Sequence, residues 1–217
     1  PAPWVEDYPP WQTRLPLLLC PSGPEPRANA APTNYAFCIG DVSQAIHAPE
    51  AQRGAFACRM TTKLSSFTDG ISNTIAVAEI GNQQDRLLSG QVAIDQPIAM
   101  LGAPIDCLGL RNAKRMSQYA ANLPLSSTGR GARWVDGAAP FGLFATILPP
   151  NSPSCAVGGS QAVDGIYSSG SLHTGGVQVA LVDGSIRFIS EKIDSGNSKL
   201  APPTAEQFTQ QPTPSPY

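Results

Sequence analysis

Proline and glycine interrupt this sequence from end to end, with 22 prolines and 20 glycines among 217 residues. Proline lacks a backbone donor and glycine loses much conformational entropy in regular structure, so long helices are disfavoured throughout. From Thr33 onward, short apolar runs alternate with turn residues, which is the pattern of a β-rich sheet. A chain of this length fits one domain, and we expect a β-rich α+β domain with an antiparallel sheet over residues 33–200.

The two ends of the chain have a different composition. Residues 1–32 are Pro-rich and contain Trp4, Tyr8 and Trp11, which is typical of an extended arm lying over a surface. Residues 201–217 are rich in Pro and Gln and have the composition of a disordered tail. We expect these two arms to pack on the domain or on a neighbouring copy.

The clearest local pattern is a β-hairpin near the C-terminus. Residues 177–182 and 185–190 are apolar, alternating runs on either side of Asp183-Gly184. Asp-Gly between such runs predicts a two-residue type I′ turn, in which both central residues take positive φ. We expect the apolar residues of both strands to form the buried face of this hairpin.

Further elements are predicted from the same kinds of pattern. A strand is expected over residues 75–80, entered through a turn at residues 68–73. A helix is expected over residues 108–122, where apolar residues recur at helical spacing before Pro124. Less regular apolar runs predict strands at residues 92–94, 145–148 and 165–167.

The charge of the chain is low and evenly spread. Lys and Arg number 14, Asp and Glu 16, and the formal net charge is −2, with no block of one sign. Nucleic-acid binders carry a concentrated basic surface, so this function is disfavoured. The longest aliphatic run, residues 17–19, is far shorter than the roughly 20 residues that span a bilayer. The sequence does not begin with Met, and we expect an upstream segment to be missing.

Five cysteines in a chain with few lysines indicate an oxidising, extracytoplasmic compartment. Cys38 and Cys58 lie in similar apolar, small-residue stretches and are predicted to join two neighbouring strands as a disulfide. Cys107 and Cys155 are a second candidate pair, which leaves Cys20 over. Because no C-x-x-C spacing occurs, a metal site built on cysteine is not expected.

Only two histidines, His47 and His173, are available for acid–base catalysis. His173 lies in a hydroxyl-rich stretch, and a Ser/His/Asp triad with Asp164 or Asp183 is one alternative. No G-x-S-x-G nucleophile elbow accompanies it. We therefore favour a non-enzymatic protein in which His173 hydrogen-bonds the hairpin turn or a nearby backbone carbonyl.

Two kinds of binding site remain open alternatives. Asp-Gly pairs begin at Asp69, Asp136, Asp164 and Asp183, and carboxylates on turns suit calcium, although Asp-Gly is also an ordinary turn dipeptide. Trp134, with charged neighbours, offers an aromatic platform for a polysaccharide, although such a Trp more often seals a core edge. No other cofactor is expected, because the sequence has no phosphate-binding or dinucleotide-binding loop.

Several short blocks of the sequence occur in the order of a known family. His173 is followed, after nine residues, by Asp183-Gly184, and the stretch TDGISNT at residues 68–74 precedes Glu79. The other blocks are LCPS at residues 19–22, TNY at 33–35, WVDG at 134–137 and LPPNSPSC at 148–155. Over roughly residues 15–194 the chain resembles the prepilin-type processing-associated H-x9-DG family of bacterial pilin-like proteins. Its signature residues, to which we assign structural roles, are His173, Asp183, Gly184, Asp69, Gly70, Ser72, Asn73, Glu79 and Trp134.

The resemblance implies a type IV pilin-like architecture, in which a hydrophobic N-terminal helix, trimmed by a prepilin peptidase, precedes an extracytoplasmic β-rich domain. That helix is absent from this sequence and would be its only contact with a membrane. The leading hypothesis is a structural protein at the cell surface or secreted. Such a subunit, pilin-like or pseudopilin-like, self-associates or decorates a filament or secretion apparatus with other pilin-like subunits. The alternatives are a secreted polysaccharide-binding module and a His-dependent hydrolase.

Overall fold

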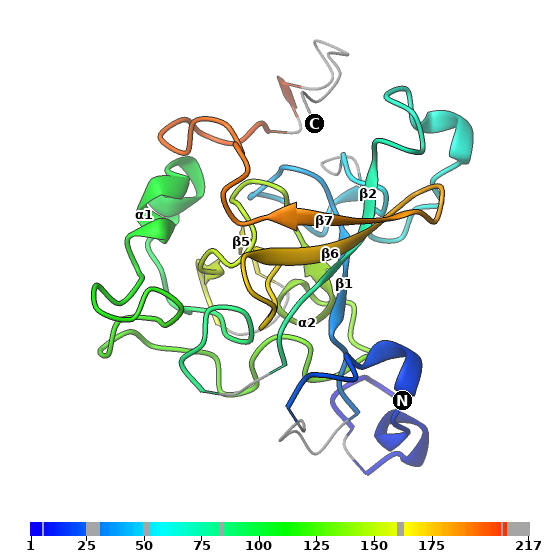
Figure 1. Ribbon diagram of the computed structural model, residues 1–217, viewed down its shortest axis with the longest axis horizontal. Coiled ribbons are helices and arrows are strands. Elements are labelled where there is room, and N and C mark those ends of the chain that lie inside the picture. Colours follow the sequence, from blue (N-terminus) through cyan, green and yellow to red (C-terminus); the bar gives the residue numbers. More distant parts are fainter. Residues whose placement is uncertain are drawn as a thin grey trace.

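Short elements linked by long irregular segments make up the fold (Figure 1). The computed structural model describes residues 1–5, 7–24, 31–49, 53–82, 85–159, 163–204 and 206–207. Within these residues, the main sheet contains β1 (Tyr35–Cys38), β2 (Ile75–Glu79), β3 (Leu143–Phe144), β6 (Gly176–Leu181) and β7 (Ile186–Ser190). A small sheet pairs β4 (Cys155–Ala156) with β5 (Gly165–Ile166). The helical elements described are α1 (Pro104–Leu108), α2 (Ala139–Gly142) and the 3-10 turns η1 (Pro9–Gln12), η2 (Pro16–Leu18), η4 (Leu64–Ser66) and η5 (Ile98–Gly102).

The main sheet has the strand order β3-β1-β2-β6-β7 and is mixed in direction. The pairs β1–β2, β2–β6 and β6–β7 are antiparallel, whereas β3 runs parallel to β1. The predicted β-rich α+β class is confirmed, and the predicted antiparallel pairing holds for three of the four strand pairs, the exception being β3. The long connection between residues 38 and 143 permits a parallel strand, which a short hairpin loop does not.

One face of the main sheet is buried. Alternate residues of β6 pack with residues of β1, β2 and β3 in one apolar cluster, whose members are Ala36, Cys38, Ala78, Ile80, Phe144, Val177, Val179 and Leu181. The strand predicted at residues 75–80 is β2, and it contributes Ala78 to this cluster.

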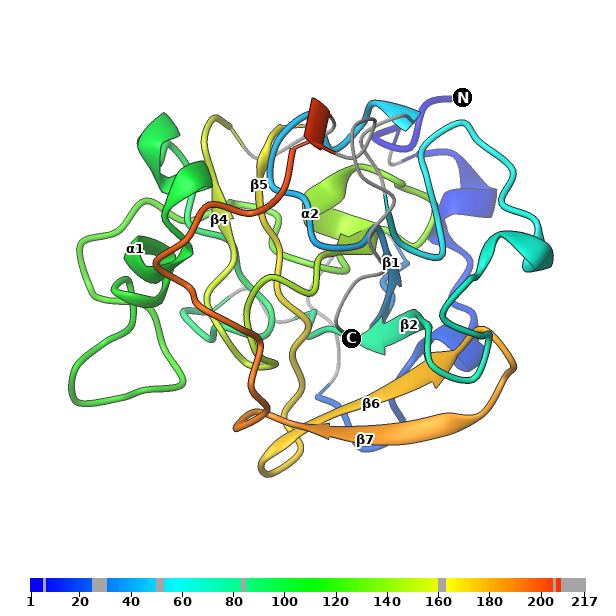
Figure 2. The same ribbon diagram turned by 90° about the horizontal axis from the view of Figure 1, so that it is seen from above.

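The opposite, outer face of the sheet is largely apolar as well. A row of directly opposed residues crosses β1, β2, β6 and β7, namely Phe37, Val77, Ala180 and Ile186. Ile186 is 64% exposed, and Phe188, two residues further along β7, is 50% exposed. Figure 2 shows the β6–β7 hairpin at the margin of the molecule, with most other segments on one side of it. The prediction that both hairpin strands bury an apolar face is therefore correct for β6, whereas on β7 only Ile189 packs against the cluster and is partly buried.

The turn of this hairpin differs from the predicted type. Leu181 N donates to Ser185 O and Gly184 N donates to Leu181 O, so residues 182–184 form a three-residue loop. Gly184 has a φ of 84°, whereas Asp183 does not take positive φ. This is a type I turn followed by a glycine bulge. The two-residue type I′ turn is not formed, because the Asp183 carboxylate accepts the Ser185 N–H at 2.9 Å and holds Asp183 in a right-handed turn.

The helix predicted over residues 108–122 is not formed. Helix α1 ends at Leu108, and the chain then folds back so that Arg111 bridges to Tyr119. The Asn112 side chain accepts hydrogen bonds from the backbone N–H groups two and three residues further on, which turns the chain out of a helical path. The apolar spacing misled because Met116, one of the apolar residues at helical spacing, is 58% exposed.

The less regular strand predictions have mixed outcomes. Residues 165–167 contain β5, as expected. Residues 92–94 form only isolated bridges at Ala93, and residues 145–148 follow β3 as irregular backbone. Residues 92–94 bond to β4 through Ala93, whose carbonyl accepts from Ala156 N, and residues 145–148 are held by contacts such as Ala145 N to Tyr167 O.

The largest apolar core surrounds a disulfide between Cys107 and Cys155. This bond confirms the second candidate pair. The predicted Cys38–Cys58 disulfide is wrong. Cys38 belongs to the apolar cluster of the main sheet, whereas Cys58 packs against the disulfide core, so the two thiols lie in different cores. Burial raises the pKa of Cys38 to about 11.

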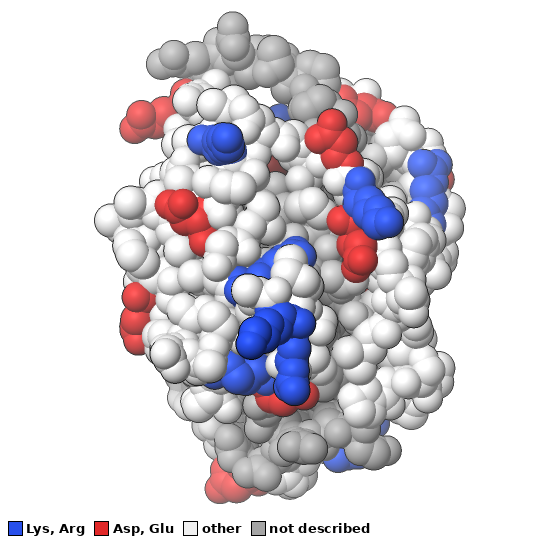
Figure 3. Space-filling model, turned by 60° about the vertical axis from the view of Figure 1, so that its left-hand side comes forward, with Lys and Arg blue, Asp and Glu red and all other residues white. Residues whose placement is uncertain are grey.

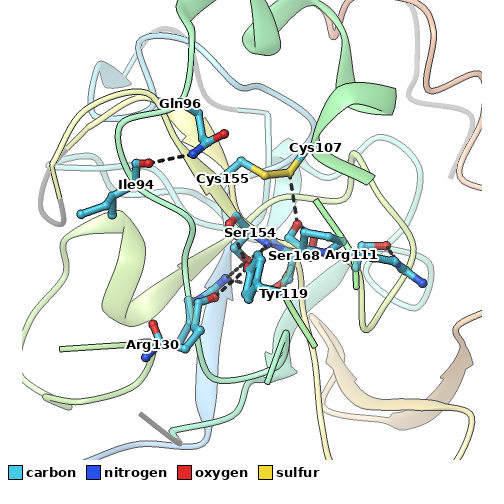
Figure 4. The surroundings of a disulfide bond; sticks show 12 residues. Ile94, Gln96, Cys107, Arg111, Tyr119, Arg130, Ser154, Cys155 and Ser168 are labelled. Carbon is cyan, nitrogen blue, oxygen red and sulfur yellow. Dashed lines mark hydrogen bonds between the residues drawn. A yellow bond between two sulfur atoms is a disulfide. The ribbon is translucent and has the colours of Figure 1, made fainter. Parts of the chain in front are cut away.

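A buried arginine lies beside the disulfide (Figure 4). Arg130 is fully buried, and it donates to Ser154 Oγ and Ser168 O, both at 2.9 Å, and to Leu143 O at 2.7 Å. Burial lowers the pKa of Arg130 to about 10, so the guanidinium stays protonated at neutral pH. Its Nε has no hydrogen-bond partner among the described residues. We call these contacts the Arg130 network, and they were not predicted from the sequence.

The N-terminal arm folds back onto its own domain. Trp11 contacts Trp134 edge to face, and the Trp134 indole N–H donates to Thr13 O at 3.1 Å. Asn34 N donates to Leu18 O at 2.8 Å, which fixes the arm beside β1. The prediction that this arm lies over a surface is correct for these residues. Parts of both predicted arms, residues 25–30, 205 and 208–217, lie outside the described residues.

The surface carries charges of both signs. Figure 3 shows one face, on which a group of Lys and Arg side chains lies near the centre, with Asp and Glu side chains around it. In the part of the chain that the structure describes, no helix has the length and apolar character needed to cross a membrane.

Candidate functional site

Three side chains with metal-ligating or acid–base chemistry converge at one end of the main sheet. His173 Nε2 lies 3.4 Å from Glu79 Oε1 and 3.6 Å from Cys20 Sγ. One ligand atom from each residue lies within 4.8 Å of the other two. Among the described residues, this is the one group of three His, Cys, Asp or Glu side chains with that arrangement. We call it the Cys20–Glu79–His173 cluster.

The antiparallel pairing of β2 and β6 explains why two of these residues meet. Glu79 is the last residue of β2, and His173 lies shortly before β6 begins. Asp69 precedes Glu79 by ten residues, and Asp183 follows His173 by ten. Each Asp-Gly pair therefore lies at the opposite end of its strand, where Asp183 N donates to Ile71 O at 3.1 Å. The H-x9-DG spacing spans one strand and does not place the histidine against the turn.

Cys20 is held in place by the buried side chain of Asn34. Cys20 N donates to Asn34 Oδ1 at 2.9 Å. The same amide donates from Nδ2 to Ile80 O at 3.1 Å, and Ile80 directly follows Glu79. One buried amide therefore connects the N-terminal arm to the end of β2, and it sets the position of the thiol relative to the carboxylate.

Glu79 and His173 are oriented by the start of β6. Glu79 Oε2 accepts a hydrogen bond from Gln178 N at 2.7 Å, which leaves Oε1 facing the imidazole. Ser171 Oγ accepts a hydrogen bond from the backbone N–H of His173 at 3.1 Å and donates one to Gly176 O at 2.8 Å. These two bonds close the loop before β6. The Glu79 side chain is 8% exposed and that of His173 is 44% exposed.

The hydrogen-bond partner predicted for His173 is wrong. The ring lies beside a carboxylate and a thiol, and not beside the hairpin turn or a backbone carbonyl. The physical reason is that the extended strand β6 carries the turn to the far end of the sheet.

Two hollows open beside the cluster. The smaller, with a volume of about 180 Å³, is lined by Cys20, Ser22, Asn34, Glu79, Leu172 and His173, among others. The larger, of about 670 Å³, extends from His173 toward Arg111 and Glu191. Because His173 lines both hollows, water and small solutes can reach the atoms of the cluster.

The members of the cluster shift one another's pKa values. The hydrogen bond with Cys20 and the charge of Glu79 raise the pKa of His173 above its ordinary value of 6.5. Partial burial acts to raise the pKa of Cys20, but the hydrogen bonds with Ser22 and His173 outweigh it and lower that pKa below 9.0. Both shifts act in the direction of a thiolate beside an imidazolium.

The geometry does not match a catalytic relay of nucleophile, base and acid. In such a triad the nucleophile and the acid bond different nitrogens of the imidazole, whereas Cys20 and Glu79 both face Nε2. The Ser/His/Asp alternative is not assembled either. Asp164 Oδ1 accepts from Ile46 N, and Asp183 bonds within its own turn at the far end of β6.

The other signature residues of the first Asp-Gly block close a loop. Asn73 Nδ2 donates to Asp69 O at 3.0 Å, and Gly70 has a φ of 90°. Ser72 is exposed on the same loop. In the part of the chain that the structure describes, the Asp-Gly carboxylates do not gather into a three-ligand group, so they offer calcium no common site.

Trp134 and Asp136 have local packing roles. Asp136 pairs with Arg133 at 3.4 Å and accepts from Ala138 N at 3.0 Å. The Trp134 ring is half-buried against Trp11 and bonded to the N-terminal arm. The expected open aromatic platform for a polysaccharide is therefore covered in part by the chain itself.

The second histidine also lies beside a cysteine. Cys58 Sγ is 3.5 Å from His47 Nδ1. Burial lowers the pKa of His47 below 6.5, although the charge of Asp164 acts to raise it. This pair does not belong to a three-ligand group of the described residues. It therefore differs from the Cys20–Glu79–His173 cluster in lacking a third ligand among those residues.

The fold and the cluster define the class of this protein as a β-rich α+β domain with one disulfide and one mixed Cys/Glu/His site. The chain belongs to the family described as "Protein of unknown function (DUF1559)", whose sequence model matches residues 2–196. No curated protein and no solved structure matches the chain.

Sequence reasoning placed Glu79 and His173 among the signature residues but missed Cys20 as their partner. The available signal was that Cys20 lies in the LCPS block, in the same series of blocks as the other two. The expectation against a cysteine metal site considered only closely spaced ligands. It does not cover three ligands that the sheet topology brings together from distant segments.

Proposed function

We propose that this protein is a structural, non-enzymatic, extracytoplasmic subunit that self-associates in the manner of a pilin-like protein. The observation that carries the proposal is the exposed apolar outer face of the main sheet. Phe37, Ile186 and Phe188 expose 46, 64 and 50% of their surfaces on or beside the cross-strand row. Contiguous apolar surface of this kind marks interaction sites on soluble proteins.

The outer face extends beyond the sheet itself. The ring of Phe56 contacts that of Phe37 edge to face, with the ring centroids 4.8 Å apart. Phe56 is 40% exposed. Apolar surface therefore continues from the β7 edge across β2 and β1 to the loop after β1.

Strand β7 adds a second property that favours association. It is the last strand in the sheet order, and no described strand pairs with its outer edge. An unpaired edge with exposed apolar side chains is a template for another strand. A second copy of this chain that meets β7 and covers the row would satisfy the backbone groups and remove the apolar side chains from water.

The disulfide and the family bear on the cellular compartment of the protein. The Cys107–Cys155 disulfide supports an oxidising compartment. Membership of the family and the pilin-like sequence blocks support a bacterial surface protein. These observations agree with a subunit that decorates, or forms part of, an extracellular filament or secretion apparatus.

The test is sedimentation velocity over a concentration series, together with electron microscopy of the same samples. The parent protein is expected to form concentration-dependent oligomers, and Ile186→Lys/Phe188→Lys to remain monomeric. Ile98→Lys is the matched control, because Ile98 is 75% exposed but lies in η5, outside the sheet. A parent that stays monomeric at high concentration, or a double variant that associates like the parent, contradicts the proposal.

A further inference from the structure

The Cys20–Glu79–His173 cluster has a geometry that hydrogen bonds alone do not explain. An imidazole Nε2 carries at most one proton, which points toward one acceptor. Here a carboxylate oxygen and a sulfur both face the same nitrogen, at 3.4 and 3.6 Å. The separation from the carboxylate oxygen is longer than the usual range for a strong hydrogen bond between charged groups.

The two separations from His173 Nε2 also match those between ligands around a single ion. Zinc binds imidazole nitrogen and carboxylate oxygen at about 2.0–2.2 Å and thiolate sulfur at about 2.3 Å, in a tetrahedron. At tetrahedral angles, a nitrogen and an oxygen ligand are roughly 3.3 Å apart and a nitrogen and a sulfur roughly 3.6 Å. The distances from His173 Nε2 to Glu79 Oε1 and Cys20 Sγ agree with these values.

We propose that Cys20, Glu79 and His173 bind one zinc ion, which fastens the N-terminal arm to the end of the main sheet. Thiolate and imidazole favour a borderline or soft transition metal over calcium or magnesium. The hollow of about 180 Å³ beside the three ligands leaves room for water as the fourth ligand. This proposal goes beyond the proposed assembly function and does not depend on it.

The surroundings of the cluster support metal binding. The second carboxylate oxygen of Glu79 is held by Gln178 N, and Asn34 holds the backbone of Cys20. Such outer contacts orient the ligands of metal sites.

Binding would join three segments of the chain. Cys20 lies on the N-terminal arm, Glu79 ends β2, and His173 lies on the loop before β6. A zinc ion would connect all three. Its removal is therefore expected to loosen residues 7–24 more than the disulfide core, which hydrogen exchange with mass spectrometry resolves.

The decisive test is calorimetric titration of the chelator-treated, full chain with Zn²⁺ alone. We expect one ion per chain. Cys20→Ser, Glu79→Gln and His173→Gln should each weaken binding by more than about 100-fold, because loss of an outer contact alone costs 10- to 100-fold. The matched controls Cys58→Ser and His47→Gln alter the other Cys–His pair and should bind zinc like the parent.

His173→Gln keeps the test independent of folding, because the side chain is 44% exposed and its loss should leave the metal-free protein folded. Alkylation provides a second readout, since bound zinc should protect Cys20, but not Cys58, from iodoacetamide. Equal zinc affinity in the parent and His173→Gln overturns the proposal. So does the absence of stoichiometric binding to the parent, or a Cys20 found in a disulfide with a second copy.

Discussion

The Arg130 network and the Cys20–Glu79–His173 cluster both gather polar groups from distant segments, but they differ in how far the fold satisfies those groups. Arg130 is fully buried, and neutral oxygens of Ser154, Ser168 and Leu143 accept hydrogen bonds from its guanidinium. In the cluster, two acceptors share one nitrogen and the site opens into two hollows. The Arg130 network therefore stabilises the core, whereas the cluster remains able to bind a ligand.

The difference follows from the surrounding structure. The Arg130 network lies against the disulfide and the largest apolar core, so water cannot replace its hydrogen bonds (Figure 4). The cluster lies where the arm, β2 and the loop before β6 meet at the surface. We therefore expect substitutions in the first region to change stability without changing zinc binding, and substitutions in the second to do the reverse.

The largest expected effect on stability comes from the disulfide beside Arg130. Its cysteines are separated by 48 residues, and closing a loop of that length contributes about 4 kcal/mol on the chain-entropy model. Cys107→Ser/Cys155→Ser should lose about that much free energy of unfolding in urea titrations. The zinc affinity of this double variant should match that of the parent. A tenfold weaker affinity would show that the two regions are coupled.

Arg130→Met should have the next largest effect. The substitution keeps the apolar stem but leaves two buried acceptors, Ser168 O and Leu143 O, without their donor, at about 1–3 kcal/mol for each buried unsatisfied group. We expect a loss of about 3 kcal/mol, measured by urea unfolding. The control is Arg187→Met, an exposed arginine on β7, which should stay within about 0.5 kcal/mol. An Arg130→Met variant as stable as the parent would remove the structural role of the network.

Zinc should stabilise the parent by a smaller amount that depends on concentration. Zinc at 100 times its dissociation constant should add about 2.7 kcal/mol, because it binds the folded state. Glu79→Gln should lose this gain, while its unfolding in a chelator should resemble that of the parent. Thermal unfolding with and without zinc measures both. A zinc-dependent gain of equal size in Glu79→Gln would contradict the role of the cluster.

The smallest effect is the pH dependence of the two histidines in zinc-free protein. The pKa of His173 is raised, so its contribution to stability is present below pH 6.5 and is lost as the pH rises through the folded-state pKa. The pKa of His47 is lowered by burial, so its contribution is present above pH 6.5 and is lost as the pH falls. NMR titration should find the two pKa values on opposite sides of 6.5, with His47→Gln assigning the signals. Two values on the same side would contradict the comparison.

Local patterns predicted the parts of the fold that depend on local physics. Alternating apolar residues around Asp183-Gly184 identified the β6–β7 hairpin, and the run at residues 75–80 identified β2. The turn type could not be predicted from the dipeptide, because the hydrogen bond from Ser185 N to the Asp183 carboxylate decides it. The helix at residues 108–122 failed because a side chain, Asn112, competes for the backbone.

The candidate site was predictable only in part. The family-like sequence blocks indicated Glu79 and His173 as signature residues. The position of Cys20 depends on a tertiary contact, the hydrogen bonds of Asn34 that fix the arm beside β2. The pairing of the cysteines likewise depends on tertiary packing, because Cys38 and Cys58 lie against separate cores.

The most direct test of the central claim is X-ray absorption spectroscopy of the zinc-loaded protein. The account predicts one sulfur ligand at about 2.3 Å, with the remaining nitrogen and oxygen ligands at about 2.0–2.2 Å in four-coordinate geometry. Cys20→Ser should lose the sulfur contribution, whereas Cys58→Ser should keep it. A spectrum of the parent that contains only nitrogen and oxygen ligands would contradict the claim that Cys20, Glu79 and His173 together hold the metal.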